Sequence, residues 1–509
     1  MTIQQTQSNK QGSDAYTERQ MPAKSTNLAM IEPSVNGRET FSGGPSPGGE
    51  QPLPVCSAPV SPAGPAGSTD RVSRPPMVAL ARPLQMLRFS RRQIEFVFRA
   101  RRQLGDVFEM HAGISGGTVV TCHPDHARSL FTAKPELVPS LTAESTLRPI
   151  VGPNSVLTAN GESHLRQRKL LLPAFHGDAV ERYTQMIAEV TEREIDTWPL
   201  GETFPLAPRM QAVTLDVIMS GIFGVEGRPA PGSAEAGLRS AVKYLTAAST
   251  SPLAKFAELA NMRSTEPVGV TRIGIGVLDR AIYSVIGARR EASNLAVRGD
   301  ILSLLLSART EDGEALSDGE LRDELVTLLL AGFETTANSL AWAWERLLRA
   351  PDAHRALVDA VRSGQDADKQ VEMVINEAMR CRPVIPIVGR RVTVPWRLGG
   401  YVLPAGSAVS VSILLLHHRE DLYPDPFAFR PERWLERKPG TYEWIPFGGG
   451  TRRCLGATLA MAEQRVVLAA MARRMDLEAD RPEPEHAQHR IVTMIPERGA
   501  RVRIRNRVS

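Results

Sequence analysis

Residues 317 to about 349 constrain the fold more than any other part of the sequence. The segment opens with Ser317-Asp318-Gly319-Glu320, the pattern of a capping box at a helix N-terminus. Beyond the cap, apolar residues occupy nearly every side of the expected helix, including the run Ala341-Trp342-Ala343-Trp344. At about 1.5 Å per residue, roughly 30 residues span about 45 Å, enough to cross a whole domain. We therefore expect a buried central helix around which the chain packs.

The rest of the sequence predicts a mainly α protein with a small β part. Apolar residues recur at helical spacing over 183–198 and 206–224. Strand-like stretches are few and short. We expect two pairings: 392–394 with 407–411 through the Gly399-Gly400 turn, and 491–494 with 500–504 around 496–499.

The first 76 residues differ in composition from the rest. They are polar at the start, and 41–76 are rich in Pro, Gly, Ser and Ala, with few side chains able to form a core. From Met77 the apolar pattern strengthens, and the whole chain, at 42% hydrophobic and 23% charged residues, has globular composition. We predict a disordered tail over 1–76 and one folded domain over 77–509.

Hydrophobicity, cysteine pattern and charge limit where the protein can act and what it can bind. No stretch reaches about 18 uninterrupted apolar residues, and the N-terminus lacks the order of a secretory signal, so we expect a cytoplasmic protein without a transmembrane anchor. The four cysteines form no C-x-x-C pair, which favours free thiols. The net charge of +5 is compatible with nucleic acid, an acidic protein partner or a merely solvated surface. Because the basic residues are scattered, we expect no nucleic-acid binding.

A glycine-rich loop from Phe447 to Gly456 surrounds Cys454 with cations and flexible backbone. A thiol must lose its proton to bind a metal strongly, and neighbouring cations lower its pKa. Glycines allow close approach to a flat ligand. The loop offers one cysteine, which favours a single axial thiolate on a haem iron over a zinc or iron–sulfur site. The plainer alternative is a surface turn with a buried cysteine.

This run matches F-x-x-G-x-R-x-C-x-G and resembles the haem-ligand loop of the cytochrome P450 superfamily. The resemblance covers about residues 77–509 and implies a soluble bacterial-type haem-thiolate monooxygenase with a mainly α, triangular haem-containing domain. It implies that Cys454 is the axial ligand of the iron of haem b, and that Phe447, Gly448 and Gly456 help to bind that cofactor.

A second motif lies inside the expected central helix, at Ala331-Gly332-Phe333-Glu334-Thr335-Thr336. A glycine, an acid and two threonines are costly in a buried helix, and threonine hydroxyls can bond back to carbonyls one turn earlier. The segment resembles the family's A/G-G-x-D/E-T-T motif. By that match Thr335 hydrogen-bonds water or dioxygen, Glu334 relays protons, and Ala331 and Gly332 leave room for dioxygen and substrate.

Two further motifs resemble the family pattern. Glu377 and Arg380 stand at i, i+3, and a P-E-R-W run containing Arg433 follows. The resemblance implies that these three form a buried structural charge cluster. It also implies that the two haem propionates bind cations and a histidine. Those candidates are His164 and Arg168, at i, i+4 on one helix face, with Arg452 and one of Arg390 and Arg391, of which spacing favours Arg390.

The resemblance also places the substrate pocket. Its expected walls are apolar or small, which favours a lipophilic substrate. They comprise the loop at about 139–156 and the residues Leu328, Ala331, Ile385, Val388 and Ile495.

The implied reaction inserts one atom of dioxygen into a substrate by hydroxylation or epoxidation. Electrons from NAD(P)H would arrive through a ferredoxin or flavodoxin with its reductase, docked near Arg452 and Arg453. We expect a monomer. Two alternatives stay open: a peroxide-dependent or isomerising haem-thiolate enzyme, and a non-enzymatic haem sensor. The presence of both Glu334 and Thr335 argues against the first of these.

Overall fold

The computed structural model describes residues 63–67, 71–111, 117–175, 178–225, 227–249, 257, 260–261, 264, 266–295, 298–309 and 313–508. The expected central helix is α12 (Asp318–Leu347). The Ser317 side chain accepts the N–H of Glu320, whose carboxylate accepts the N–H of Ser317, so the capping box is formed. Trp342 and Trp344 are fully buried. The prediction of a long, buried helix is confirmed.

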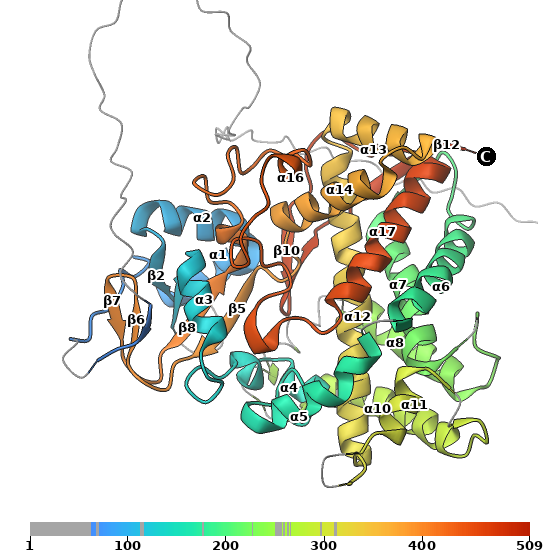
Figure 1. Cartoon of the computed structure of the whole chain (residues 1–509), viewed down its shortest axis with the longest axis horizontal. Helices are drawn as coiled ribbons and strands as arrows, with labels where there is room; N and C mark the ends of the chain where they lie inside the picture. The colour runs from blue at the N-terminus through green and yellow to red at the C-terminus, as the bar shows by residue number, and fades with distance from the viewer. Residues whose placement is uncertain are drawn as a thin grey trace, which may run out of the picture. The chain divides into compact units, whose positions relative to one another are not determined.

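Other helices surround α12, which Figure 1 shows in yellow through the middle of the helical part. Those in contact with it are α4 (Arg148–Val151), α7 (Leu206–Phe223), α10 (Gly269–Arg290), α11 (Ile301–Ser307), α13 (Pro351–Ser363), α14 (Ala367–Cys381) and α17 (Ala457–Arg474). Farther out lie α5 (Gly161–Leu171), α6 (Asp178–Ile195) and α8 (Ala234–Ser249). The helices predicted over 183–198 and 206–224 correspond to α6 and α7. One large apolar core joins these helices, with Phe333 and Leu340 of α12 inside it.

A second core lies beside the main sheet. Four strands occur in the order β2 (Val107–Met110), β3 (Thr118–Thr121), β8 (Ala408–Ser412) and β5 (Ile387–Arg391). Only the β3–β8 pairing is parallel. This core includes residues of the flanking elements α2 (Gln93–Leu104), α3 (Pro124–Thr132) and α15 (Ile413–Leu416). Helix α1 (Arg82–Arg91) precedes α2, and α16 (Arg433–Glu436) follows the sheet in the chain.

The remaining strands form three small sheets. Their orders are β1 (Gly64–Pro65), β6 (Trp396–Leu398), β7 (Tyr401–Leu403); β4 (Thr203–Pro205), β12 (Arg501–Arg507), β9 (Met475–Ala479); and β10 (Ala487–Arg490), β11 (Thr493–Pro496).

The first predicted strand pairing is right in part. Val392 exchanges backbone hydrogen bonds with Ser407 and Gly406, next to the pairing of Arg391 with Ala408, but β8 pairs mainly with 387–391 and with β3, and the Gly399-Gly400 turn joins β6 to β7. The second predicted pairing is wrong: β11 pairs with β10, whereas β12 is bordered by β4 and β9. Between those two strands, β12 buries Val502 and Ile504.

Most of the predicted tail, residues 1–76, lies outside the described residues. Within its described part, β1 pairs with β6 and Ser73 forms a bridge with Val402. Ordered contacts therefore begin before residue 77, and the boundary of the folded domain stays a prediction. Among the described residues, no helix combines the length and apolarity needed to span a membrane.

Candidate active site

A cavity of about 1630 Å³ lies between α12 and the Cys454 loop. It exceeds the roughly 300–1,000 Å³ of an ordinary small-molecule site, so it has room for a large cofactor and a substrate. Every cofactor, catalytic and pocket residue expected from the sequence lines it: His164, Arg168, Leu328, Ala331, Glu334, Thr335, Ile385, Val388, Arg390, Phe447, Gly448, Arg452, Cys454, Gly456 and Ile495.

The Cys454 loop depends on glycine at two positions. Gly448 and Gly450 have φ of +68° and +65°, in the left-handed region that side chains disfavour. A Cβ on Gly450 would lie 1.8 Å from the carbonyl oxygen of Phe131 in α3, so this position admits no side chain. The N–H of Cys454 donates to the oxygen of Phe447 at 3.0 Å, which closes the loop just before α17.

The Cys454 thiol is accessible, and the surface that it exposes faces the cavity. Burial raises the pKa of the thiol, while the Gly456 N–H and the cations Arg453 and Arg168 lower it. The sequence analysis gave weight only to the cations; in the structure, desolvation outweighs them. A metal ion reverses this balance because a coordinating thiol is deprotonated outright.

Three arginines point charge into the cavity without a carboxylate beside them. Arg390 lies over the Phe131 ring, 5.1 Å from its centroid, and its guanidinium donates to the adjacent Gly389 oxygen. Arg168 donates to the oxygen of Arg453 at 2.7 Å. Among the described residues, none of Arg168, Arg390 and Arg452 forms a salt bridge. Burial lowers the pKa of Arg390 and of Arg452 to about 10, and in each case a second arginine adds to the effect. By contrast, Arg391 pairs with Glu144 outside the cavity.

His164 on α5 completes this cationic end. It is buried, and its Nδ1 has no hydrogen-bond partner among the described residues. Burial and the arginines Arg452, Arg168 and Arg390 lower the pKa of His164 to about 4, so the imidazole is neutral at neutral pH. Buried Arg390 and partly buried Arg168 and Arg452, all without a carboxylate partner among the described residues, suit a dianionic ligand together with the unpartnered ring nitrogen. Two propionates beside an accessible cysteine meet that requirement, so the residues fit haem.

The α12 motif lines the cavity as the resemblance implies for Ala331 and Thr335. The Thr335 hydroxyl donates to the Ala331 oxygen at 2.6 Å, one turn earlier. Ala331 exposes its methyl group to the cavity. Gly332 also lines the cavity. A Cβ there would lie 2.4 Å from Ile218 of α7, so this glycine also lets α7 approach α12.

Glu334 has a partner that the sequence analysis missed. Its carboxylate accepts from Nε of Arg490 at 3.1 Å and lies 2.6 Å from Nη2 of the same guanidinium. Thr493 adds a hydroxyl donor at 3.3 Å. Both partners belong to the β10–β11 hairpin, 156 and 159 residues away in the chain. No local spacing could have indicated this contact.

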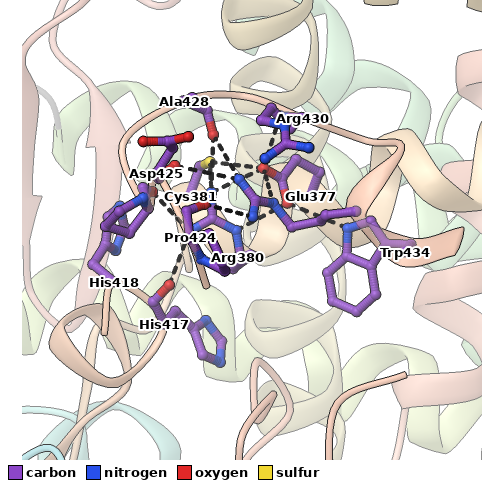
Figure 2. Close-up of polar contacts among 12 residues, drawn as sticks. Glu377, Arg380, Cys381, His417, His418, Pro424, Asp425, Ala428, Arg430 and Trp434 are labelled. Atoms are coloured by element: carbon purple, nitrogen blue, oxygen red, sulfur yellow. Dashed lines mark hydrogen bonds and ion pairs between the residues drawn. The ribbon is translucent and has the colours of Figure 1, made fainter. Parts of the chain in front are cut away.

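Glu377 and Arg380 of the E-x-x-R motif lie together away from the cavity (Figure 2), and Arg433 of the P-E-R-W motif joins them. Glu377 accepts from Nη2 of Arg380 at 2.8 Å and from Nε of Arg433 at 3.0 Å. The N–H of Arg430 and the indole of Trp434 also donate to it. The remaining guanidinium donors reach backbone oxygens, including that of Ala428. This cluster is closed: its donors and acceptors satisfy one another.

The far end of the cavity is formed by residues that the sequence analysis did not identify. It is lined by Tyr183 of α6, Gln211 and Ile218 of α7, and Tyr244 and Ile273 of α8 and α10. Residues at helical spacing look the same whether they face a core or a ligand, so spacing alone could not identify them.

A family model described as Cytochrome P450 matches residues 74–502. Two similar proteins come from Mycobacterium tuberculosis. One, named cytochrome P450 135B1, is 37% identical over 443 residues, covering 86% of this chain and 92% of that protein. The other, named cytochrome P450 138, is 36% identical over 444 residues, covering 86% and 97%. A solved structure of cyanobacterial CYP120A1 with retinoic acid bound matches with a TM-score of 0.70 at 23% identity, over 86% of this chain and all of that chain.

Proposed function

The chain belongs to the cytochrome P450 family, and on that premise we propose that Cys454 ligates the iron of a haem b in a monooxygenase acting on a lipophilic substrate. The reaction inserts one atom of dioxygen by hydroxylation or epoxidation. The observation that carries the assignment is the combination, in one cavity, of an accessible cysteine with three arginines that lack carboxylate partners.

When bound, the haem supplies the activation of dioxygen that no side chain provides. The protein supplies binding and orientation. Arg168, Arg390 and Arg452 hold the propionates through charge-assisted hydrogen bonds, and the neutral His164 donates a further one. The Gly456 N–H, which already lowers the pKa of the thiol, stabilises negative charge on the sulfur.

Thr335 and Glu334 handle protons on the α12 side. The Thr335 hydroxyl already donates to the Ala331 oxygen, so its own oxygen is left to accept from water in the cavity. Glu334 forms an ion pair with Arg490. To collect and pass on a proton, its carboxylate must leave that guanidinium, so Arg490 controls when Glu334 is available.

The walls of the cavity favour a lipophilic substrate. Leu328, Ile385, Val388 and Ile495 contribute apolar surface near α12, and the cavity continues to the apolar side chains of α8 and α10. Apart from the propionate-side arginines, the cation on the α12 side, Arg490, is already paired with Glu334. A long apolar molecule therefore suits the site better than a strongly charged one.

Electrons come from NAD(P)H through a ferredoxin or flavodoxin with its reductase. Support comes from Arg453, which is exposed and adjacent to Cys454, so an acidic donor could approach the sulfur side of the site. Reversing the charge at Arg453 should slow reduction and weaken its dependence on salt. Unchanged rates and unchanged salt dependence would contradict this docking site.

Labelled dioxygen tests the proposed reaction. Purified protein with a surrogate ferredoxin, its reductase and NADPH is offered a library of fatty acids, terpenoids, steroids and polyketides under oxygen-18 gas. We expect a product carrying one labelled oxygen atom, absent when NADPH is omitted. Product formed only with added peroxide would favour the peroxide-dependent alternative. Haem binding without any product under either condition would favour a sensor.

A further inference from the structure

Residues 152–160 connect α4 to α5 and pass beside the first half of α12; these helices lie together in Figure 1. We call this stretch the 152–160 segment. It contains almost no regular structure, yet its conformation is fixed from both ends by polar contacts. One end is bound to acidic residues of α12, and the other is bound to the Cys454 loop.

Asp323 of α12 binds the first part of the segment. Its Oδ2 accepts two hydrogen bonds from Asn154, one from the backbone N–H and one from the side-chain amide, both at 3.0 Å. Asp323 is buried and pairs with Arg322, which also pairs with Asp279 of α10. A Cβ on Gly152, whose φ is +87°, would lie 2.0 Å from Oδ1 of Asp323. The segment and this carboxylate are therefore closely complementary.

The next turn of α12 holds the middle of the segment. Oε1 of Glu324 accepts the N–H of Val156 at 2.8 Å, and the Thr327 hydroxyl donates to the Ser155 hydroxyl at 2.6 Å. Glu324 is fully buried. A buried carboxylate lowers the stability of the fold unless it is hydrogen-bonded. The hydrogen bonds from the 152–160 segment therefore stabilise Asp323 and Glu324 in their buried positions.

The last part of the segment contacts the cofactor end of the cavity. Arg452 donates to the Ala159 oxygen and, at 2.7 Å, to Oδ1 of Asn160. Asn160 also accepts the N–H of Ser140 at 3.0 Å. Helix α5 begins at the following residue and carries His164. The position of this segment therefore sets both the direction of the Arg452 guanidinium and the start of the His164 helix.

We propose that Asp323 and Glu324 are positioning residues: through the 152–160 segment, they orient Arg452 and His164 toward the haem propionates. Neither acid touches the cofactor or the reacting atoms. The inference rests on the proposed function, because it takes haem to be the group that Arg452 and His164 bind. It predicts that loosening the segment weakens haem retention while leaving the iron ligand unchanged.

Two variants loosen the segment in opposite ways. Asp323→Ala removes the acceptor of both Asn154 bonds, and Gly152→Ala adds a methyl group where the carboxylate lies. Asp318→Ala is the matched control, because it removes an exposed acid of the same helix that pairs with Arg290. Each holoprotein is mixed with excess apomyoglobin to follow haem release. Hydrogen exchange of the backbone amides of the segment is measured in parallel, together with global unfolding.

We expect both variants to keep a thiolate-type carbon monoxide band, to release haem about 10- to 100-fold faster, as is typical when outer-shell partners are removed, and to lose amide protection at Asn154 and Val156. Asp318→Ala should match the unaltered protein. Haem release at the unaltered rate in both variants, with or without faster amide exchange, would overturn the proposal. So would faster release that merely tracks lower global stability. The carbon monoxide band of the unaltered protein tests the proposed function separately.

Discussion

Two groups of arginines, one buried and one only partly buried, lie in different parts of the structure and differ in their ionic partners. Arg380 and Arg433 both pair with Glu377, so every charge in the group has an ionic partner within the group. Arg168, Arg390 and Arg452 face the cavity, and no carboxylate among the described residues pairs with them. We call the first the closed cluster and the second the open cluster.

The two clusters differ in whether a carboxylate of the protein pairs with the arginines. A buried charge that the chain itself neutralises is structural, and its loss destabilises the fold. A buried charge that the chain leaves unpaired costs folding free energy, which a ligand of opposite charge offsets on binding. The open cluster therefore indicates a dianionic ligand without any reference to sequence motifs. Four substitutions test this division.

The largest expected effect is on the closed cluster. Glu377→Ala leaves Arg380 and Arg433 buried without an acid and should lower the free energy of unfolding by about 3–5 kcal/mol. Urea denaturation measures this. Glu372→Ala is the control, because Glu372 lies on the same helix in an exposed pair with Arg465, and such pairs contribute about 0–1 kcal/mol. Equal losses in the two variants would contradict the closed-cluster assignment.

Glu334 tests an intermediate case, since its pair with Arg490 is neutralised yet lines the cavity. If Glu334 relays protons, Glu334→Gln should reduce turnover by about 100-fold, a typical loss for general acid–base catalysis, while folding changes little. Steady-state turnover in water and in deuterium oxide measures this. An unchanged rate and an unchanged solvent isotope effect would assign the pair to structure alone.

The open cluster should respond in the reverse manner to the closed one. Arg390→Met removes an unpaired cation, so the apoprotein should unfold at the same or higher urea concentration, whereas haem should be released about 10-fold faster. Arg391→Met is the control, since Arg391 pairs with Glu144 outside the cavity. If Arg390→Met destabilised the apoprotein as strongly as Glu377→Ala does, the distinction between the clusters would fail.

The last test concerns pH and a buried acid without a cation. Burial raises the pKa of Glu324 to about 8, and the neighbouring carboxylates Asp323 and Glu320 contribute. Since the folded state holds this proton more tightly than the unfolded state, its stabilising effect is complete below about pH 4.5 and is lost as pH rises through about 8.

Glu324→Gln should remove this pH dependence, so its stability relative to the unaltered protein should improve between pH 5 and 8.5. Thermal unfolding across that interval, in one buffer series, measures the difference. Parallel stability curves for the two proteins would show that Glu324 is already ionised in the fold.

The sequence predicted features that are set by residues close together in the chain. It did not predict contacts between residues far apart in the chain. The Ser317 cap, the long α12, the glycines around Cys454 and the Glu377–Arg380 spacing are all encoded within a few residues. The partners of Glu334 and Asp323 lie 156 and 169 residues away, so no spacing rule indicates them. The pairing of 491–494 with 500–504 failed for the same reason: alternating apolar residues identify a strand such as β12 without identifying the strands beside it.

The site was predicted better than the sheets because the family's motifs mark it directly. Even there, the close approach of Ile218 to Gly332 was missed, since a glycine does not reveal what packs against it. The balance of the Cys454 pKa was also misjudged, because charge can be read from sequence and desolvation cannot.

The ligation of haem iron by Cys454 is tested by the carbon monoxide difference spectrum of the dithionite-reduced protein, measured beside Cys454→Ala. If the cavity holds haem on a thiolate, the Soret band should be strongly red-shifted from that of a histidine-ligated haem, and the shift should vanish in the variant. A band at the position of a histidine-ligated haem, or no haem band at all in folded protein, would contradict haem binding through the Cys454 thiolate.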